Sequence, residues 1–367
     1  MTSTGQKIKL AVIFGGVSSE HEVSLMSAAS IIDNLGAEKY EIYRVGITKE
    51  GKWLLYTGDT KMLSAGEWET PELTTPAFLS PDPTVHGLVI LKDTGAQIIP
   101  LDCIFPALHG KNGEDGTIQG LFQLSGIPYV GCNTLSSAVC MDKAVTHTLL
   151  SAANIEQAHY LWFYADRFDV AADTIKAKIE ARLNFPVFVK PANAGSSVGV
   201  SKVERKEDLD EAIRKAMKED SKIVVEEGIV GQEVECAVLG NREADASPVG
   251  EIGASAAFYD YEDKYINGTS QLFIPARIDE ETAEKIRQTA VRAYRWLGCS
   301  GLARVDFFVT EGDHRVILNE INTLPGFTSI SMYPKLWMHA GMSYSELLDR
   351  LVELAFQKKE RSLKANG

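Results

Sequence analysis

The chain has 367 residues, of which 45% are hydrophobic and 24% charged, and this predicts a soluble globular protein of two to three domains at roughly 150 residues each. The net charge of −13 argues against a general nucleic-acid or membrane surface, so an anionic ligand would need a local cluster of lysine and arginine. No apolar run reaches the roughly 18 residues of a membrane helix, no signal peptide is evident, and the five cysteines lack C-x-x-C spacing; we therefore expect reduced thiols in a cytoplasmic protein.

Residues 1–131 alternate between strand-like and helix-like patterns. Strands are predicted at 8–16, 40–48, 102–108 and 127–131, and helices at 17–35 and 117–126. This alternation predicts an N-terminal α/β domain with an open parallel sheet.

Two loops of this first unit carry polar side chains. Ser19 and Glu22 fit a capping box, which leaves Glu20 as a spare carboxylate at the edge of the sheet where α/β proteins bind ligands. In the second loop, Asp115 or Thr117 is expected to cap the following helix, which leaves His109 unexplained.

The second unit spans 132–230 and the third 231–367. In the second, helices are predicted at 136–155 and 206–220, and strands at 185–191, 199–203 and 222–229. In the third, strands are predicted at 231–240 and in both halves of 302–322, and helices at 279–298 and 343–360.

The segment NAGSSVGV, residues 193–200, connects two strand-like runs. Gly195 and Gly199 permit close approach of a backbone, while Ser196 and Ser197 offer hydroxyl and amide donors to an anion. Lys190, at the end of the preceding strand, adds a positive charge. The segment is therefore either a phosphate-binding loop or a plain hairpin turn.

The run from Leu302 to Asn322 predicts a hairpin whose turn lies at Gly312 and Asp313. Centring the turn there places Asp306 opposite Asn319 or Glu320. Arg304 then shares a face with Asp306, and Glu320 with Asn322. Two carboxylates and an amide suit Mg²⁺ bound to nucleotide phosphates, although a solvated sheet edge would carry similar charges.

The tyrosine-rich stretch 258–276 is interpreted as a lid with Lys264 and Tyr265 pointing inward, or else as a packed surface loop.

Three segments of the chain are distinctive: HGKNGEDGTIQG (109–120), LGCSGLARVDFFV (297–309) and NEINTLPGFTS (319–329). With these segments the chain resembles, from end to end, the D-alanine–D-alanine ligases of the ATP-grasp superfamily. The order of GGVSSEHEVS, KPANAGSSVGVSK and YDYEDKY fits as well. Ile330 stands in TSIS where many members have TSHS, and MYPKLW is similar to a Gram-positive branch.

The resemblance implies a three-domain ATP-grasp architecture that grips ATP between its central and C-terminal units. The implied ATP-binding residues are Lys143, Lys190, Ser197, Glu226, Glu227, Ile229, Glu233, Lys264 and Asn319. The implied ligands of two Mg²⁺ ions, for which Mn²⁺ can substitute, are Asp306, Glu320 and Asn322. The implied catalytic residues are Glu20, Ser196, Tyr265, Arg304 and Gly326, and the implied substrate-binding residues are His109, Ser331, Met332 and Tyr259.

The implied activity is ATP-dependent formation of D-alanyl-D-alanine through an acyl phosphate, for peptidoglycan synthesis, by a homodimer that joins through its N-terminal domains. A D-alanine–D-serine ligase of the vancomycin-resistance type remains an alternative. The apolar residues Leu324, Phe327, Ile330 and Met332 around the second subsite favour D-alanine. A D-lactate ligase is disfavoured by Tyr265.

Two alternatives from other functional classes remain. The complete acidic set argues against a non-catalytic nucleotide-binding module. Gly15-Gly16 alone is a weak signal for a Rossmann oxidoreductase.

Overall fold

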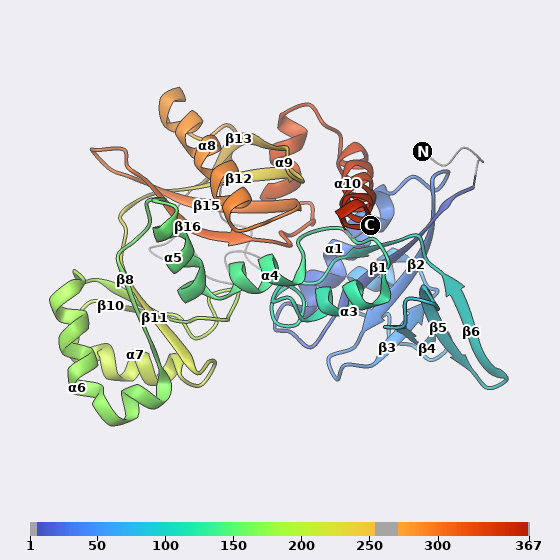
Figure 1. Ribbon diagram of the computed structural model, residues 1–367, viewed down its shortest axis with the longest axis horizontal. Coiled ribbons are helices and arrows are strands. Elements are labelled where there is room, and N and C mark those ends of the chain that lie inside the picture. Colours follow the sequence, from blue (N-terminus) through green and yellow to red (C-terminus); the bar gives the residue numbers. More distant parts are fainter. Residues whose placement is uncertain (1–5, 254–270, 366–367) are drawn as a thin grey trace.

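The computed structural model describes residues 6–253 and 271–365, in which three β-sheets are flanked by helices (Figure 1). The strands are β1 (Ile8–Gly15), β2 (Tyr40–Ile47), β3 (Trp53–Tyr56), β4 (Thr74–Leu79), β5 (Gly87–Lys92), β6 (Gly95–Pro100), β7 (Cys103–Pro106), β8 (Tyr160–Tyr164), β9 (Val187–Pro191), β10 (Ser201–Val203), β11 (Lys222–Glu227), β12 (Gly231–Gly240), β13 (Ala244–Gly253), β14 (Gln271–Phe273), β15 (Gly301–Thr310) and β16 (Val316–Asn322). The helices are α1 (His21–Asn34), α2 (Thr60–Ser64), α3 (Thr117–Ser125), α4 (Thr134–Met141), α5 (Lys143–Ala152), α6 (Ala165–Arg182), the short 3-10 helix η1 (Lys206–Asp208), α7 (Leu209–Ala216), α8 (Glu280–Trp296), α9 (Met332–His339) and α10 (Tyr344–Ala365). None of the helices in this described part is long and apolar enough to cross a membrane.

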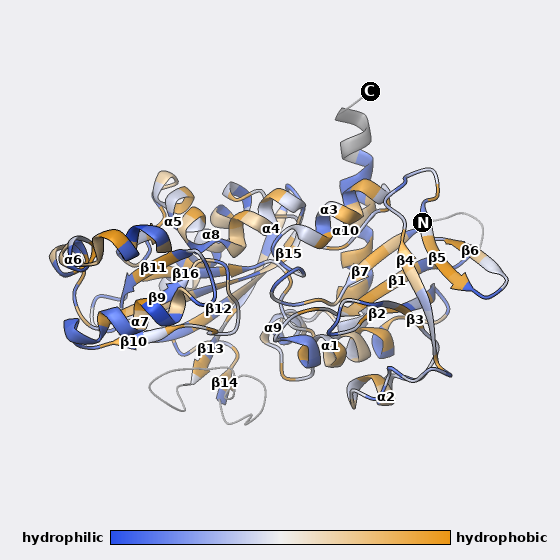
Figure 2. Ribbon diagram, turned by 90° about the horizontal axis from the view of Figure 1, so that it is seen from below, coloured by the Kyte–Doolittle hydropathy of each residue, from blue (hydrophilic) through white to orange (hydrophobic). Residues whose placement is uncertain are grey.

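The N-terminal sheet has the strand order β6-β5-β4-β3-β2-β1-β7. β1 pairs in parallel with β2 and β7, which is the predicted parallel core. β3 to β6 extend it as an antiparallel meander, which was not predicted. Figure 2 shows strands of this sheet as largely hydrophobic. Because carboxyl ends of parallel strands meet at one edge, the loops after β1 and β7 lie side by side.

The capping box predicted at the start of α1 is wrong. The helix begins at His21, and Glu20 occupies the N-cap position without a side-chain cap hydrogen bond. Ser18 Oγ accepts from the Glu20 backbone N–H at 3.1 Å, and Glu22 pairs with Lys49 on the surface. Glu20 is therefore held at the helix entrance, where its carboxylate is buried.

The central sheet is antiparallel, in the order β10-β9-β11-β8. The single helix predicted over 136–155 is two helices, α4 and α5, divided at Asp142, whose backbone is extended (φ −81°, ψ 99°). The Asp142 carboxylate accepts from the Val145 N–H at 3.1 Å and pairs with Lys222 of β11. This cap against the sheet explains the break and places Lys143 in the first turn of α5.

The C-terminal sheet has the order β14-β13-β12-β15-β16. The predicted hairpin is confirmed, since β15 pairs with β16 and Asp306 lies opposite Glu320, with Arg304 opposite Asn322. A register shift follows Asp306, which marks an irregularity in the strand next to the acidic residues.

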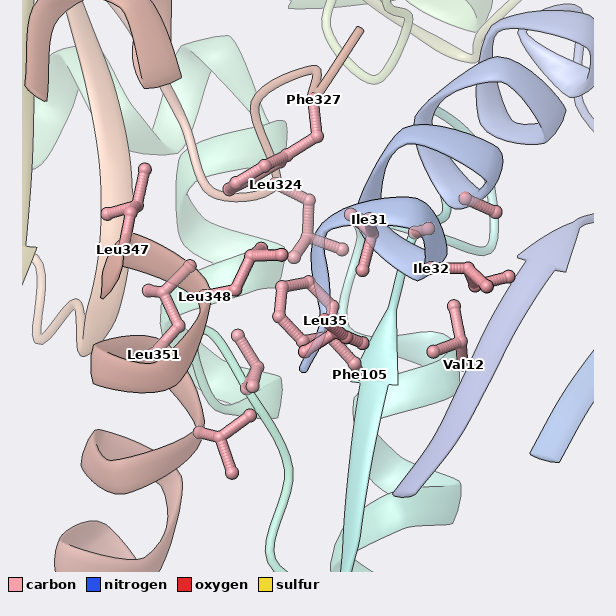
Figure 3. Close-up of a cluster of buried hydrophobic side chains, with 14 of the residues drawn as sticks. Val12, Ile31, Ile32, Leu35, Phe105, Leu324, Phe327, Leu347, Leu348 and Leu351 are labelled. Atoms are coloured by element: carbon pink, nitrogen blue, oxygen red, sulfur yellow. The ribbon is translucent and has the colours of Figure 1, made fainter. Parts of the chain in front are cut away.

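A buried cluster joins the N-terminal sheet to the C-terminal part of the chain (Figure 3). Phe327 lies in it with its ring centroid 6.0 Å from that of Phe105 on β7 and 5.7 Å from that of Tyr333 on α9. Leu351 of α10 and Leu35, directly after α1, belong to the same cluster. Phe327 was expected to border the second subsite, but it is a core residue that anchors the loop between β16 and α9.

The three sheets fall within the three predicted units. The domain boundaries near residues 131 and 230 stay a prediction, because α10 from the third unit packs against β7 of the first.

Candidate active site

A cavity of about 300 Å³ is lined by residues from all three units. Among the predicted site residues in the described part of the chain, those that line it are Glu20, His109, Lys143, Lys190, Ser196, Ser197, Glu226, Glu227, Ile229, Glu233, Arg304, Asn319, Glu320, Asn322, Gly326, Ser331 and Met332. Asp306 does not line the cavity itself, but it is hydrogen-bonded to Arg304 and Asn322, and both of these residues line the cavity. Tyr259, Lys264 and Tyr265, together with Tyr261, lie outside the described residues.

The Gly/Ser loop meets the entrance of α1. Ser196 Oγ donates to Glu20 Oε1 at 2.5 Å, although the two residues are 176 positions apart. Gly195 allows this approach, because a Cβ there would lie 3.0 Å from Glu20 Oε2. Ser196 and Ser197 both adopt left-handed backbone conformations, with φ of 49° and 59°. Glu20 and Ser196, both expected to be catalytic residues, are thus hydrogen-bonded to each other, and the buried Glu20 carboxylate can accept a cation.

His109 bridges α1 and the loop after β16. Its Nδ1 lies 3.0 Å from the Leu324 carbonyl oxygen and its Nε2 lies 3.0 Å from Ser27 Oγ, which also accepts from the Phe327 N–H at 3.3 Å. Burial alone would lower the pKa of His109, but the neighbouring Glu114 carboxylate outweighs it and raises the pKa. Sequence reasoning gave no role to Ser27 or Glu114. The periodicity of α1 could have indicated that Ser27 is buried.

Two lysines reach the cavity from different elements. Lys143 Nζ donates to the Ala194 carbonyl oxygen at 2.7 Å, and Lys190 Nζ donates to Glu226 Oε2 at 2.6 Å. Burial lowers the pKa of Lys143, and the Glu320 carboxylate opposes this effect. The lysines therefore place positive charge near the base of the Gly/Ser loop.

Glu226 is almost fully buried between two basic side chains. Besides Lys190, His147 contacts it, with 2.9 Å between His147 Nε2 and Glu226 Oε1. Burial alone would raise the pKa of Glu226, but Lys190 and His147 outweigh it and hold the pKa well below the ordinary value. His147 was missed, although its spacing of four from Lys143 on a helix places the two side chains on one face.

Arg304 and Asn322 of the hairpin form a hydrogen-bonded group around Asp306. Arg304 donates to Asp306 from Nε at 2.8 Å and from Nη2 at 2.7 Å, and Asn322 Nδ2 donates to the same carboxylate at 3.0 Å. Glu235 of β12, which sequence reasoning missed, pairs with Arg304 at 3.0 Å. Arg304 is thereby fixed in orientation toward the cavity.

The predicted metal ligands lie on the adjacent strands β15 and β16. Among the described residues, no group of three or more His, Cys, Asp or Glu side chains could hold an ion by itself. Asp306, Glu320 and Asn322 supply two carboxylates and one amide, which are hard oxygen donors suited to Mg²⁺. Such a set fits an ion whose coordination is completed by phosphate oxygens.

The loop before α9 brings Gly326 and Ser331 together. A Cβ at position 326 would lie 2.7 Å from Ser331 Oγ, so a larger residue there would displace the Ser331 hydroxyl. Ser331 Oγ accepts from the Thr328 N–H at 3.0 Å and lies 2.9 Å from Thr328 Oγ1. Ile330 next to it is 46% exposed, so one wall of this part of the cavity is apolar and open.

Comparisons with known proteins agree with this geometry. A family model described as "D-ala D-ala ligase C-terminus" matches residues 149–353, and one described as "D-ala D-ala ligase N-terminus" matches residues 9–132. The D-alanine–D-alanine ligase of Caldicellulosiruptor bescii is 52% identical over 355 residues, which cover 97% of each chain. That of Acetivibrio thermocellus is 49% identical over 371 residues, covering 98% of this chain and 99% of its own.

Solved structures give the same result. The VanG D-Ala:D-Ser ligase from Enterococcus faecalis superimposes with a TM-score of 0.87 at 45% identity and covers 95% of this chain and 100% of its own. The D-alanine–D-alanine ligase from Coxiella burnetii gives a TM-score of 0.83 at 35% identity, covering 98% of this chain and 97% of its own. The chain therefore belongs to the D-alanine–D-alanine ligase family and has its ATP-grasp fold.

Proposed function

We propose that the protein joins two D-alanine molecules into D-alanyl-D-alanine at the expense of ATP, as a step in peptidoglycan precursor synthesis. The observation that carries the proposal is that one cavity combines the hydrogen-bonded Glu20–Ser196 pair with two lysines and the acidic hairpin. The pair suits the ammonium group of an amino acid, and the remainder suits a nucleotide triphosphate.

In the first step, the carboxylate of one D-alanine attacks the γ-phosphorus of ATP, the bond to the β-phosphate oxygen breaks, and ADP leaves. Glu20 and Ser196 hold the ammonium group so that the carboxylate faces the phosphate. Lys143 and Lys190, with donors of the Gly/Ser loop, align and neutralise the phosphates. The product is an acyl phosphate.

The charge of the cavity supports the need for a divalent ion. Its lining includes three Lys and Arg residues but seven Glu residues, so a triphosphate would meet net repulsion without added cations. We propose that Asp306, Glu320 and Asn322 hold Mg²⁺, or Mn²⁺ in its place. When bound, the ions would neutralise charge on the phosphates.

In the second step, the free amine of another D-alanine attacks the acyl carbon. Arg304 and the Gly326 N–H are proposed to stabilise the tetrahedral oxyanion, and such a donor contributes about 3–4 kcal/mol in other enzymes. The carbon–oxygen bond to the phosphate then breaks, and inorganic phosphate leaves as the amine loses its proton. Water would hydrolyse the acyl phosphate, so we propose that the Gly/Ser loop excludes it.

A D-alanine–D-serine ligase is the second candidate, favoured by the similarity to the VanG enzyme. We place D-alanine first, because Ile330 and Met332 are apolar and the Ser331 hydroxyl already bonds within its own turn. A buried serine hydroxyl without a partner would cost about 1–3 kcal/mol.

The test is ADP release by the purified protein with saturating D-alanine in the first site and either amino acid as the second substrate. We expect kcat/KM to favour D-alanine. A preference of about tenfold or more for D-serine would replace the first candidate by the second, since an apolar pocket by itself discriminates only weakly against an added hydroxyl.

We further propose a cytoplasmic homodimer that joins through the N-terminal domains. Light scattering at micromolar protein concentration tests the assembly, and a monomeric mass would refute it.

A further inference from the structure

His147 of α5 lies between two acceptor side chains. Its Nε2 is 2.9 Å from Glu226 Oε1 on β11, and its Nδ1 is 2.6 Å from Gln157 Oε1. The imidazole stacks on Tyr160 of β8, with 4.4 Å between ring centroids and 18° between planes. The ring is buried and held from three sides, so it has little freedom to turn.

The hydrogen bonds around Gln157 define its orientation. Gln157 Nε2 donates to the His147 carbonyl oxygen at 2.8 Å and to Ser151 Oγ at 2.7 Å. Ser151 Oγ itself donates to the His147 carbonyl oxygen at 2.9 Å, so it can only accept from Gln157. A flipped amide would place oxygen against oxygen, and Gln157 Oε1 must therefore face the imidazole.

Both ring nitrogens of His147 thus face oxygen atoms that can only accept. A neutral imidazole carries a single N–H and would leave one short contact without a proton. The arrangement is satisfied when both nitrogens carry protons, which makes His147 a fixed cationic donor to Glu226.

We infer that His147 is a positioning residue that holds the Glu226 carboxylate as an ionised, correctly turned acceptor for the exocyclic amino group of the nucleotide base. This inference rests on the proposed function, in which Glu226 contributes to the nucleotide site. His147 itself acts through Glu226 and is not a group that reacts.

Lys190 cannot fulfil this role alone. It donates to the other carboxylate oxygen, Glu226 Oε2, at 2.6 Å, but it is also proposed to contact the phosphates of ATP. As Lys190 engages the phosphates, its contact with Glu226 weakens. The donor from His147 to Oε1 then remains to keep the buried carboxylate charged and oriented.

The chemistry of the bases makes this role measurable. Adenine presents an amino group at the position where guanine presents a carbonyl oxygen. An ionised carboxylate only accepts hydrogen bonds, so it favours adenine and repels guanine. If His147 orients Glu226, its loss weakens binding of ATP and also weakens the discrimination between ATP and GTP.

Two substitutions distinguish the contributions of the two ring nitrogens of His147. In His147→Gln the side-chain amide reaches the place of Nε2 and keeps a donor to Glu226, whereas in His147→Asn it reaches only the place of Nδ1. We expect H147N to raise the KM for ATP about tenfold and to lower the ATP/GTP ratio of kcat/KM by a similar factor, with the KM for D-alanine changed less than about twofold. H147Q should stay within about threefold of wild type in each quantity.

The control is His339→Asn, because His339 is an exposed residue at the end of α9, and this variant should match wild type. Thermal unfolding of H147N and H147Q separates a loss of stability from a loss of nucleotide selectivity. Equal KM values for ATP in H147N and H147Q, or an unchanged ATP/GTP ratio in H147N, would overturn the inference.

Titration with ADP keeps this test independent of ligation. If the wild-type protein releases no ADP with D-alanine but H147N binds ADP more weakly than H147Q, the proposed function fails and the role of His147 stands. If either variant fails to fold, ¹⁵N-histidine spectra of the wild-type protein decide the question. A buried imidazole protonated on both nitrogens that shifts on ADP addition supports the inference, and its absence overturns it.

Discussion

Removal of the Ser196 hydroxyl should impair recognition of the first D-alanine while leaving ATP binding nearly intact. Ser196 Oγ donates to Glu20 Oε1 at 2.5 Å, and Glu20 is only 7% exposed. A hydrogen bond to a charged group of this kind contributes about 1.5–3 kcal/mol. At 1.36 kcal/mol per factor of ten, Ser196→Ala should lower kcat/KM for the first D-alanine about 10- to 150-fold.

Two matched variants identify the cause. Ser196→Gly also lacks the hydroxyl but relieves the left-handed backbone at φ 49°, so it should lose the same activity while being more stable than S196A by up to about 1 kcal/mol. Ser197→Ala, at the adjacent position, should instead raise the KM for ATP.

The assay is coupled ADP release at saturating ATP with D-alanine varied. A double-mutant cycle with Glu20→Gln should give a coupling energy of about 1.5–3 kcal/mol. Additive effects, or S196A activity within about twofold of wild type, would refute the reasoning.

Two other predictions concern charges. Glu320→Gln keeps the shape of the side chain but removes one negative charge from the proposed metal site. ADP release should therefore fall by about a hundredfold or more, while thermal stability stays unchanged. Near wild-type activity at ordinary Mg²⁺ concentration would contradict the metal assignment. Lys358 Nζ donates to the Gly131 carbonyl oxygen at 2.6 Å and lies 3.8 Å from the Tyr129 ring centroid. Burial at this place lowers the pKa of Lys358 to about 8. Below pH 8 the Lys358 ammonium is protonated in both the folded and the unfolded chain. Between pH 8 and the ordinary lysine pKa of 10.5 it stays protonated only in the unfolded chain, so the free energy of unfolding rises with pH in this window. Relative to Lys358→Met, the free energy of unfolding should therefore rise by about 1–2 kcal/mol from pH 7.5 to 9.5 in urea titrations, and parallel pH profiles would contradict this.

The sequence by itself determined the features that depend on neighbours along the chain. The alternation of side chains along a strand and the turn at Gly312 were sufficient to place Asp306 opposite Asn319 or Glu320, because a hairpin register follows from its turn. The register shift after Asp306, which only the structure shows, decides for Glu320. The Gly/Ser loop between two strands was predicted in the same way. Family resemblance then supplied roles for residues that spacing alone left open.

Local patterns were misleading where distant packing decides the outcome. The sequence around Ser19 and Glu22 fits a capping box, but the tertiary structure engages Glu22 with Lys49 and turns Glu20 inward. One helical pattern runs through Asp142, but contact with Lys222 of the central sheet divides it. Phe327 was expected to border the second subsite, but it is a core residue because α10 folds back over the N-terminal sheet.

Only the tertiary structure decided how the site is assembled. Ser196 reaches Glu20 across 176 residues, and His147 reaches Glu226 across 79. The periodicity of a helix or strand defines which face a side chain occupies, but it carries no information about which distant element covers that face. The packing of three sheets around one cavity supplies that information. It brings buried charged side chains from different sheets together, and these side chains must then pair with each other because an unpaired buried charge is strongly destabilising.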